Sequence, residues 1–404
     1  MTNPNWLPSR VRHNFHLDVF AAVGGGTFVA VLVAFMPVVV RRLGGSPTDV
    51  AIVVGAPFFG HLLAPFFTYL LAHIAPVRVV AGTVTLARTL FLAGILMATT
   101  PLMFALTTVV FWVVTIANVA AYTTLMRGIY PDTERAHVMG KVRVGGAIAG
   151  IISASLAGVF IDTVPVQWVF AVAALVSLPG ALMFFKIDYQ SETAGFGTRR
   201  PMPEIVRDVW RDTRYRRLML SFLIFGWGNL MNFAVFPIML VDRFDAPNTF
   251  VGIMSGVQSA TMVGAYVIVG RLIDRGSSLR QTLISTTLVL LVPFGYLVAP
   301  AYWALLPVAI VAGVTAASGE LTYHTNLVQM APPGRLAEYA AVQSLLLGIR
   351  GSLAPFAASA LLGVVAAPAV LAVGLAFMVA GTIVMVGAVR EPRAIAAPTA
   401  IPAA

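Results

Sequence analysis

Five ionisable residues stand out within or beside long apolar runs of this chain, where a charge is costly. They are His61, Arg88, Glu320, His324 and Arg350. A charged side chain at the centre of a bilayer costs roughly 2.5–3.5 kcal/mol on insertion scales, so such residues are candidates for function. Glu320 and His324 are four residues apart, which places both on one face of a helix. These residues could carry a proton or contact a solute inside a membrane.

Glu320 is the acidic member of this set, and it allows two interpretations. In the first, the carboxylate gains and loses a proton as the protein changes conformation, with Arg350 stabilising its charged form in one state, which predicts proton coupling. In the second, Glu320 and Arg350 form a permanent ion pair that holds two helices together. Asp18 and His61 are the next candidates for a coupling residue. For His61 and Arg88 the sequence favours a role in helix packing.

The composition indicates that the solvent of this chain is a lipid bilayer. Of the 404 residues, 59% are hydrophobic and 10% are charged, whereas about 25% of the residues in an average soluble domain are charged. Apolar runs of about 20 residues recur from end to end. Because these runs are continuous rather than alternating, the spanning elements are helices and not barrel strands. The chain has no cysteine, which excludes disulfides, thiolate metal sites and cysteine nucleophiles.

We predict an all-α membrane protein with twelve transmembrane helices. The expected spans are 17–40, 50–72, 79–100, 102–125, 138–160, 168–185, 218–240, 250–270, 281–300, 302–323, 341–364 and 369–389. One long polar connection separates the sixth and seventh spans, and 203–216 within it could form an amphipathic helix on the membrane surface. The predicted organisation is a six-helix bundle over 1–190, a linker over 191–216, a six-helix bundle over 217–390 and a disordered tail over 391–404.

The positions of the basic residues predict the orientation of the chain. The net charge is +10, and 21 of the 26 Lys and Arg residues fall in segments on the same side as the amino terminus. Arg41, Arg42 and Arg243 fall on the other side. By the positive-inside rule both termini lie in the cytoplasm, and we expect a multi-pass protein of the cytoplasmic (inner) membrane. The basic charge therefore reports topology, and we expect no nucleic-acid partner.

The two halves of the chain repeat at an offset of 201 residues. The offset relates Tyr122, Thr124, Pro131 and Gly150 to Tyr323, Thr325, Pro332 and Gly351, and it relates 48–52 to 249–253. One offset serves loops and helices alike, and six spans is an even number. The halves therefore share one orientation and are related by an axis along the membrane normal. This parallel six-plus-six arrangement resembles the major facilitator superfamily.

A loop motif also supports the resemblance. The end of the eighth span reads Gly270-Arg271-Leu272-Ile273-Asp274-Arg275-Gly276-Ser277-Ser278-Leu279-Arg280. This is similar to the superfamily's signature of a glycine, Asp-Arg four residues later, then a glycine and basic residues. The second glycine stands one place early, and the matching loop of the first half lacks the motif. The resemblance implies a cytoplasmic gate formed by Gly270, Asp274 and Arg275; the alternative is that Asp274 and Arg275 only end a helix.

The resemblance further implies that the first, fourth, seventh and tenth helices line a central cavity. The fourth and seventh have polar and aromatic residues at helical spacing, namely Trp112, Thr115, Asn118 and Tyr122, and Phe225, Asn229, Asn232 and Phe236. Aromatic side chains with scattered amides suit an amphipathic organic molecule better than a sugar. The alternative is that half of these residues pack between helices. Gly24, Gly25 and Gly26 in the first helix would permit a bend or a close helix contact.

These features favour a secondary transporter that moves a small organic solute by alternating access, coupled to protons. Efflux of amphipathic compounds is one form of this function. The alternatives are uptake of an organic anion or another metabolite, and a non-transporting receptor on the same fold. The only lysines, Lys141 and Lys186, lie outside any nucleotide-binding motif, which excludes an ATP-driven pump. We expect a monomer in the lipid bilayer that is not an enzyme and has no cofactor and no metal.

Overall fold

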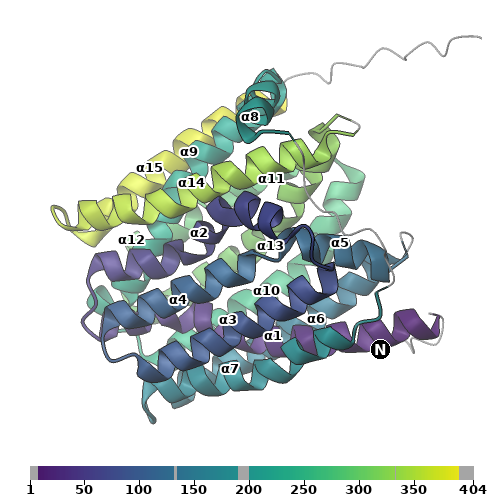
Figure 1. The fold of residues 1–404 in the computed structure, drawn as a ribbon. Helices are drawn as coiled ribbons and strands as arrows, with labels where there is room; N and C mark the ends of the chain where they lie inside the picture. The colour runs from purple at the N-terminus through teal and green to yellow at the C-terminus, as the bar shows by residue number, and fades with distance from the viewer. Residues whose placement is uncertain (1–7, 132–133, 190–199, 333, 391–404) are drawn as a thin grey trace, which may run out of the picture.

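The structure is a computed structural model that describes residues 8–131, 134–189, 200–332 and 334–390. All regular elements in these ranges are helices. They form two bundles; in Figure 1 most of the purple-to-blue start of the chain lies below, and the yellow-green helices near its end lie above. The predicted disordered tail, 391–404, and the first part of the predicted linker, 191–199, lie outside the described residues.

The first half runs from α1 to α7. Its elements are α1 Ser9–Arg42, α2 Pro47–Leu71, α3 Pro76–Met97, α4 Pro101–Ile116, α5 Val119–Ile129, α6 Arg135–Phe160, α7 Val166–Met183 and the 3₁₀ turn η2 Phe184–Lys186. Three of these helices begin with a proline, whose missing N–H costs nothing at a helix start. Ser46 and Asp49 add a capping box at the start of α2. These start signals let the helices follow one another through short loops.

The second half follows a connecting helix, α8 Met202–Trp210. Its elements are α9 Thr213–Ile238, the π-helical turn η3 Met239–Arg243, α10 Asn248–Arg275, α11 Ser278–Leu288, α12 Leu291–Val298, η4 Tyr302–Leu305, α13 Leu306–Met330, α14 Leu336–Leu362 and α15 Ala367–Arg390. Asp212 caps α9 by accepting a hydrogen bond from the backbone N–H of Tyr215 at 3.0 Å. Because α1 begins and α15 ends on one side of the membrane, we call that the terminal side and the opposite one the far side.

The prediction of twelve spans is confirmed, with one change of shape. Eleven helices of the described chain are long and apolar enough to cross a membrane, and α4 with α5 makes a twelfth span. This span is not the straight helix predicted over 102–125, because it bends by 42° between α4 and α5. At the bend the N–H of Asn118 donates to the Thr115 carbonyl, and the Asn118 amide donates to Thr83 Oγ1 of α3 at 3.0 Å. The helical ladder is thus interrupted where a neighbouring helix holds a polar side chain.

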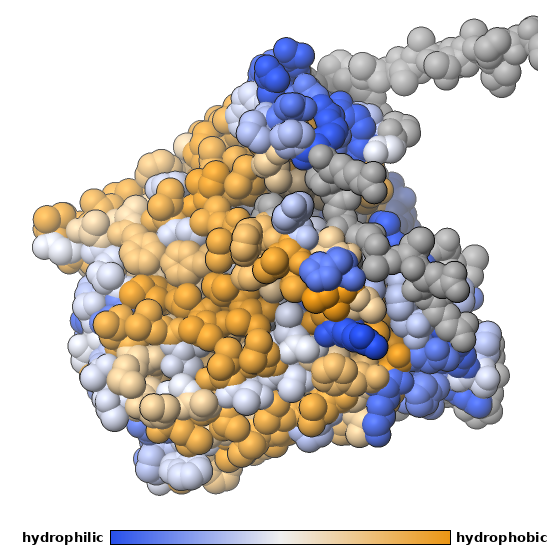
Figure 2. All heavy atoms as spheres, in the orientation of Figure 1, coloured by the Kyte–Doolittle hydropathy of each residue, from blue (hydrophilic) through white to orange (hydrophobic). Residues whose placement is uncertain are grey.

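The outer surface of the bundles is apolar. Large hydrophobic side chains such as Phe66, Trp168, Val267 and Ile383 are more than half exposed. Figure 2 shows apolar residues over most of one face, and hydrophilic residues gathered toward the end where the chain begins. This distribution suits a belt of lipid chains with polar ends in water. It also explains why α1 starts before the predicted span at 17, since its first turns lie at the hydrophilic end.

Two helix pairs join the halves, α2 with α14 and α6 with α10. A Cβ on Gly252 would lie 2.9 Å from the Ala154 carbonyl oxygen, so a glycine is required for α6 and α10 to approach this closely. Near the far side, Thr48 Oγ1 lies 2.9 Å from Ser359 Oγ, and Thr249 Oγ1 donates to the Gly158 carbonyl at 3.3 Å. The offset of 201 residues relates these two contacts to each other. The repeat in the sequence is therefore present in the contacts between the halves.

The connecting helix α8 belongs to the second half. Its residues Ile205 and Val209 are fully buried against side chains of α9 and α14. The predicted amphipathic helix is thus present over Met202–Trp210, and α9 begins soon after it, at Thr213. Its apolar face packs on protein, and its position at the membrane surface stays a prediction.

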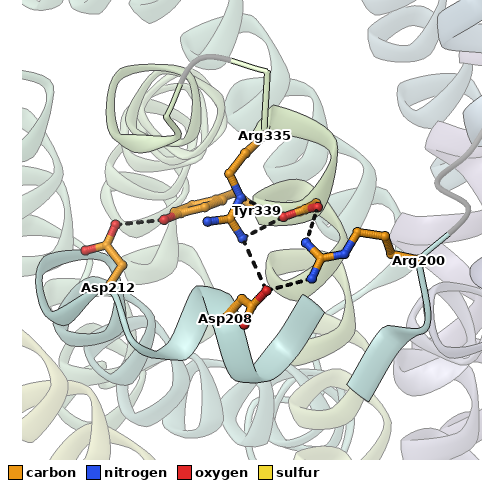
Figure 3. A network of polar contacts seen from close by, with 6 residues as sticks. Arg200, Asp208, Asp212, Arg335 and Tyr339 are labelled. Atoms are coloured by element: carbon orange, nitrogen blue, oxygen red, sulfur yellow. Dashed lines mark hydrogen bonds and ion pairs between the residues drawn. The ribbon is translucent and has the colours of Figure 1, made fainter. Parts of the chain in front are cut away.

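A network of charges fixes the polar face of α8 (Figure 3). Arg200 donates to Asp208 of α8 at 2.6 Å and to Glu338 of α14 at 2.8 Å. Arg335 forms an ion pair with Glu338 at 2.7 Å, and Tyr339 donates its hydroxyl to Asp212 at 2.9 Å. The hydrogen bond from Arg200 lowers the pKa of Asp208. The network holds α8 on the start of α14, so we expect both to move as one body.

Candidate functional site

Polar contacts join the two halves at the far side. Arg41 at the end of α1 donates from Nε and Nη2 to the carboxylate of Asp242 at 2.9 and 2.5 Å. Asn248 Nδ2 donates to Asp162 Oδ1 at 2.5 Å, and Arg42 donates to the Ala246 carbonyl. We call Arg41, Arg42, Asp162, Asp242 and Asn248 the far-side latch. Arg41 and Asp242 are related by the repeat offset, so their ion pair lies on the axis that relates the halves.

The terminal side has no comparable latch among the described residues. Tyr69, near the end of α2, is 85% exposed. Asp274 and Arg275 lie in the last turn of α10, where both are exposed and have no ion pair in the described chain. Gly270, one turn earlier, leaves open space where a Cβ would be. The halves are thus closed on the far side, and the predicted gate residues are unengaged in this conformation.

Glu320, in α13 of the second half, forms a contact with the first half. Arg143 of α6 donates Nη1 to Glu320 Oε1 at 3.1 Å, and Tyr266 of α10 donates its hydroxyl to Oε2. Glu320 stands ten residues before the end of α13 at Met330, or about 15 Å at 1.5 Å per residue. The Glu320 side chain is 34% exposed and that of Arg143 is 63% exposed. The contact is a partly solvated ion pair, within the spans, that links the first half to the second.

The predicted ion pair between Glu320 and Arg350 was wrong. Arg350 of α14 donates Nη1 to the Phe222 carbonyl oxygen of α9. A Cβ on Gly226 would lie 2.6 Å from Arg350 Cζ, so the guanidinium packs directly on α9. The reason is the direction of the two side chains, because Arg350 points toward α9 while Glu320 points toward α10 and α6. The two residues lie on neighbouring helices in the sequence and face different partners.

The two histidines near these residues differ in their contacts. His324 follows Glu320 by one helical turn but is exposed, and its ring meets that of Tyr323 edge to face at 5.6 Å between centroids. His61 of α2 has Nδ1 3.2 Å from Ser344 Oγ of α14, a polar contact between the halves. His61 is thus hydrogen-bonded within a helix interface, as the packing interpretation expects.

Arg88 and Asp18 are both buried in the first half. Arg88 is 7% exposed, and it donates Nε to Ser177 Oγ at 2.8 Å and Nη1 to the Val84 carbonyl at 3.1 Å. It therefore ties α3 to α7 within one half, which agrees with a packing role. Asp18 of α1 is 2% exposed and accepts a hydrogen bond from the Tyr130 hydroxyl at 2.9 Å.

Three of the eight predicted cavity residues pack inside one half. Asn118 bonds to α3 as described above, and Asn232 is fully buried with its amide 3.4 Å from Met378 Sδ of α15. Phe236 stacks on Tyr296 of α12 at 4.4 Å between ring centroids. We therefore assign these three to helix packing. The other five, namely Trp112, Thr115, Tyr122, Phe225 and Asn229, are half-buried and stay predicted cavity residues.

The three glycines of α1 provide close contact with neighbouring helices and not a bend. A Cβ on Gly24 would lie 3.2 Å from Ser177 Cα of α7, and one on Gly26 would clash with the backbone of Gly146 in α6. Helix α1 runs without a break from Ser9 to Arg42. Glycines thus bring three helices of the first half together.

Sequence reasoning missed the partners that cross between the halves. Arg143 lies near the start of the predicted span over 138–160, but its position in the sequence does not indicate a contact with the other half. Tyr266 was not singled out, since one tyrosine in an apolar helix is unremarkable in sequence. Arg41 and Asp242 could have been found, because the repeat offset relates them directly and their charges are opposite.

The fold and these contacts define a class of protein. Two parallel six-helix halves meet through two helix pairs, close on one side and share an ion pair across their boundary, which is the architecture of a membrane transporter and not of an enzyme. The family model of the Major Facilitator Superfamily matches residues 19–355. The chain belongs to this superfamily. A comparison with curated proteins found no match.

Solved structures of transporters share the fold. A bacterial homologue of the iron transporter ferroportin, in an inward-facing state, has a TM-score of 0.72 at 14% identity. The alignment covers 95% of this chain and 100% of the homologue. The nucleoside transporter NupG has a TM-score of 0.67 at 13% identity, covering 95% and 100%. The human organic anion transporter MFSD10 has a TM-score of 0.67 at 13% identity, covering 94% and 100%. At these identities the likeness concerns the fold alone.

Proposed function

We propose that this protein is a proton-coupled secondary transporter of a small amphipathic organic solute, which works by alternating access. The proteins of similar fold are named for iron, a nucleoside and organic anions, so the fold leaves the solute open. The terminal side faces the cytoplasm, because most Lys and Arg residues lie there. The far-side latch then closes the outer face of the membrane. Efflux and uptake are both compatible with this cycle.

The ion pair between Arg143 and Glu320 carries the proposal for proton coupling. It joins α6 of one half to α13 of the other, so rocking of the halves changes the distance between its members. The pair exists only while Glu320 is ionised. A proton on Glu320 would therefore remove a contact of this conformation, and the conformational equilibrium would depend on protonation. The Tyr266 hydroxyl can donate to a carboxylate or accept from a carboxylic acid, so it can hold either form.

The test is Glu320→Gln in proteoliposomes, with solutes found first by a thermal-shift screen of the purified protein. Gln keeps the shape of the side chain but cannot take up and release the proton. We expect solute-driven proton movement to be abolished, while counterflow exchange of labelled solute is largely kept. Glu204→Gln is the matched control, because Glu204 is exposed on α8 outside the spans. Unchanged proton movement in Glu320→Gln would exclude the coupling role.

A purely structural ion pair would behave differently. Removing one partner would then lower the yield of folded protein together with both modes of transport. The double variant Glu320→Gln with Arg143→Gln would restore folding in that case, since neither charge is left alone. Loss of counterflow in Glu320→Gln, with recovery in the double variant, would therefore assign the pair to packing.

The orientation has its own test with reporter fusions. A reporter at Thr163, in the exposed turn between α6 and α7, should read outside. A reporter at Gly195, which lies outside the described residues, should read cytoplasmic. The reverse pattern would invert the assignment of the two sides.

A further inference from the structure

Arg350 has hydrogen-bonding capacity that the protein leaves unused. Its Nη1 donates to the Phe222 carbonyl, while Nε is buried without a hydrogen-bond partner. No carboxylate in the described part of the chain forms an ion pair with it. A charge inside a span is costly unless it is paired and hydrogen-bonded, so an incompletely bonded arginine in the spans requires an explanation.

Arg88 provides the internal comparison. It is the other arginine in the middle of a span, and it also lies against a glycine of the first helix of its half, with the Gly25 Cβ position 3.2 Å from Nη2. The repeat offset relates Gly25 to Gly226, the glycine beside Arg350. Arg88 nevertheless has both Nε and Nη1 bonded to oxygens of its own half. A packing role therefore accounts for Arg88, whereas it leaves the Nε of Arg350 unexplained.

The surroundings of Arg350 suit a ligand that has a charged head and an apolar body. A small cavity of about 10 Å³ adjoins the guanidinium, with walls from Met219, Phe222, Tyr323, Gln343, Leu346 and Leu347. This is roughly the space of one water-sized group, so in this conformation it admits an oxygen of a head group and not a ring. Phe222 and Tyr323 stack at 6.0 Å between ring centroids, and the Gln343 amide already donates to the Tyr323 carbonyl at 3.3 Å. Arg350 is the one cationic side chain among the residues that line this cavity.

We infer that Arg350 binds the anionic head of the transported solute, which is an organic anion with an apolar body. A guanidinium can donate two parallel hydrogen bonds to a carboxylate or sulfonate, and Nε is one of the donors that such a pair uses. The apolar walls from α9 and α14 then contact the rest of the molecule. The inference rests on the proposed transport function, because it names the class of solute for the same protein.

The test compares two probes of nearly the same shape, the anion 1-naphthoate and its neutral amide 1-naphthamide. Their binding to the purified protein in nanodiscs is measured by calorimetry, for the wild type and for Arg350→Gln. We expect the wild type to bind naphthoate and Arg350→Gln to bind it about ten- to a hundredfold more weakly, the range for hydrogen bonds to charged groups. Binding of naphthamide should be weak in both. Arg350→Lys should recover part of the affinity, because it keeps the charge and loses the planar fork.

Two further variants separate binding from folding. Gly226→Ala keeps Arg350 but places a Cβ 2.5 Å from its Nη1, so it should displace the guanidinium and weaken naphthoate binding as well. Arg88→Gln removes the other arginine in the middle of a span and should leave naphthoate binding unchanged. Equal binding of the two probes, unchanged affinity in Arg350→Gln, or no binding of naphthoate, octanoate and naphthalene-1-sulfonate to the wild type would overturn the inference.

The outcome also distinguishes this inference from the proposed function. Proton-coupled flux of a neutral or cationic solute, unaffected by Arg350→Gln, would leave the transporter intact and refute the anion site. Binding of anions through Arg350 without any flux in proteoliposomes would support the site and refute the transport proposal.

Discussion

Breaking the far-side latch should shift the protein toward a conformation open on the far side. The perturbation is Asp242→Asn, which removes the carboxylate that Arg41 contacts from two nitrogens. Arg41 keeps its bond to the Gly45 carbonyl at 2.8 Å, so the variant loses the contact between halves without leaving the cation unbonded. The closed state should therefore be destabilised while each half stays folded.

The size of the shift follows from the exposure of the pair. The side chains of Arg41 and Asp242 are 25% and 41% exposed, so solvent and salt screen the interaction. A pair of this kind contributes about 1 kcal/mol even when it is bidentate. The population open on the far side should thus rise about fivefold. The shift should shrink at high salt for the same reason.

Cysteine labelling can measure this shift, because the chain has no cysteine of its own. Ser155→Cys is a suitable reporter, since Ser155 Oγ would lie 3.0 Å from a Cβ on Gly256, in the interface between α6 and α10. Labelling by a water-soluble maleimide should be about fivefold faster in the Asp242→Asn background. The charge-swapped pair Arg41→Asp with Asp242→Arg should return the rate to near the wild-type value.

A second ion pair supplies the control for this measurement. Arg10 and Asp188 pair at 2.9 Å with similar exposure, 37% and 46%, but both belong to the first half. Asp188→Asn removes an equivalent interaction and should leave labelling of Ser155→Cys unchanged. Acceleration by Asp188→Asn as large as that by Asp242→Asn would refute the reasoning, because loosening of one half would then explain both.

Two further predictions concern the terminal side. Asp274→Asn should slow transport more than it weakens solute binding, and it should also slow labelling of Ser155→Cys. The reason is that Asp274 is unengaged here and is expected to act in the opposite conformation. Equal losses of flux and affinity would contradict this prediction. Asp208→Asn should reduce the fall in melting temperature that occurs as the pH is lowered. The pKa of Asp208 is lowered by Arg200, so its contribution is present above its usual pKa and is lost as pH falls through the lowered value. Melting curves of wild type and variant between pH 7 and pH 2 test this, and parallel curves would exclude the contribution.

The spans and the repeat could be predicted from the sequence because each is set by one strong physical requirement. A bilayer demands about 20 apolar residues for each crossing, and the chain meets this demand twelve times. The bend in the fourth span was missed because hydropathy does not report which neighbour a polar residue such as Asn118 will contact. Helix starts on the terminal side were missed as well, since polar turns at a membrane surface are helical without being apolar.

The contacts of the charged residues could not be predicted because they depend on the rotation of each helix about its own axis. Glu320 and Arg350 were the two opposite charges on neighbouring spans, so sequence reasoning paired them. In the structure each finds a nearer partner on a helix that is distant in the sequence. Such pairs are set by the packing of the halves. The repeat offset was the one sequence signal that could indicate a contact between the two halves.

That offset also bears on why coupling should reside on one side of the boundary. It relates Arg143 of α6 to Ser344 of α14, and both residues form a polar contact with the opposite half, Arg143 with Glu320 and Ser344 with His61. The offset does not relate their partners, because Glu320 lies in α13 and His61 in α2, so the two contacts join different helix pairs. One is an ion pair and the other is a hydrogen bond between the His61 ring and a neutral hydroxyl. Protonation of Glu320 removes a charge attraction on the α6 side, whereas the Ser344 hydroxyl can accept from His61 in either charge state of the ring. The repeat thus places a polar contact residue at the same position of α6 and α14, and the difference in residue type makes only the α6 contact depend on an acidic proton.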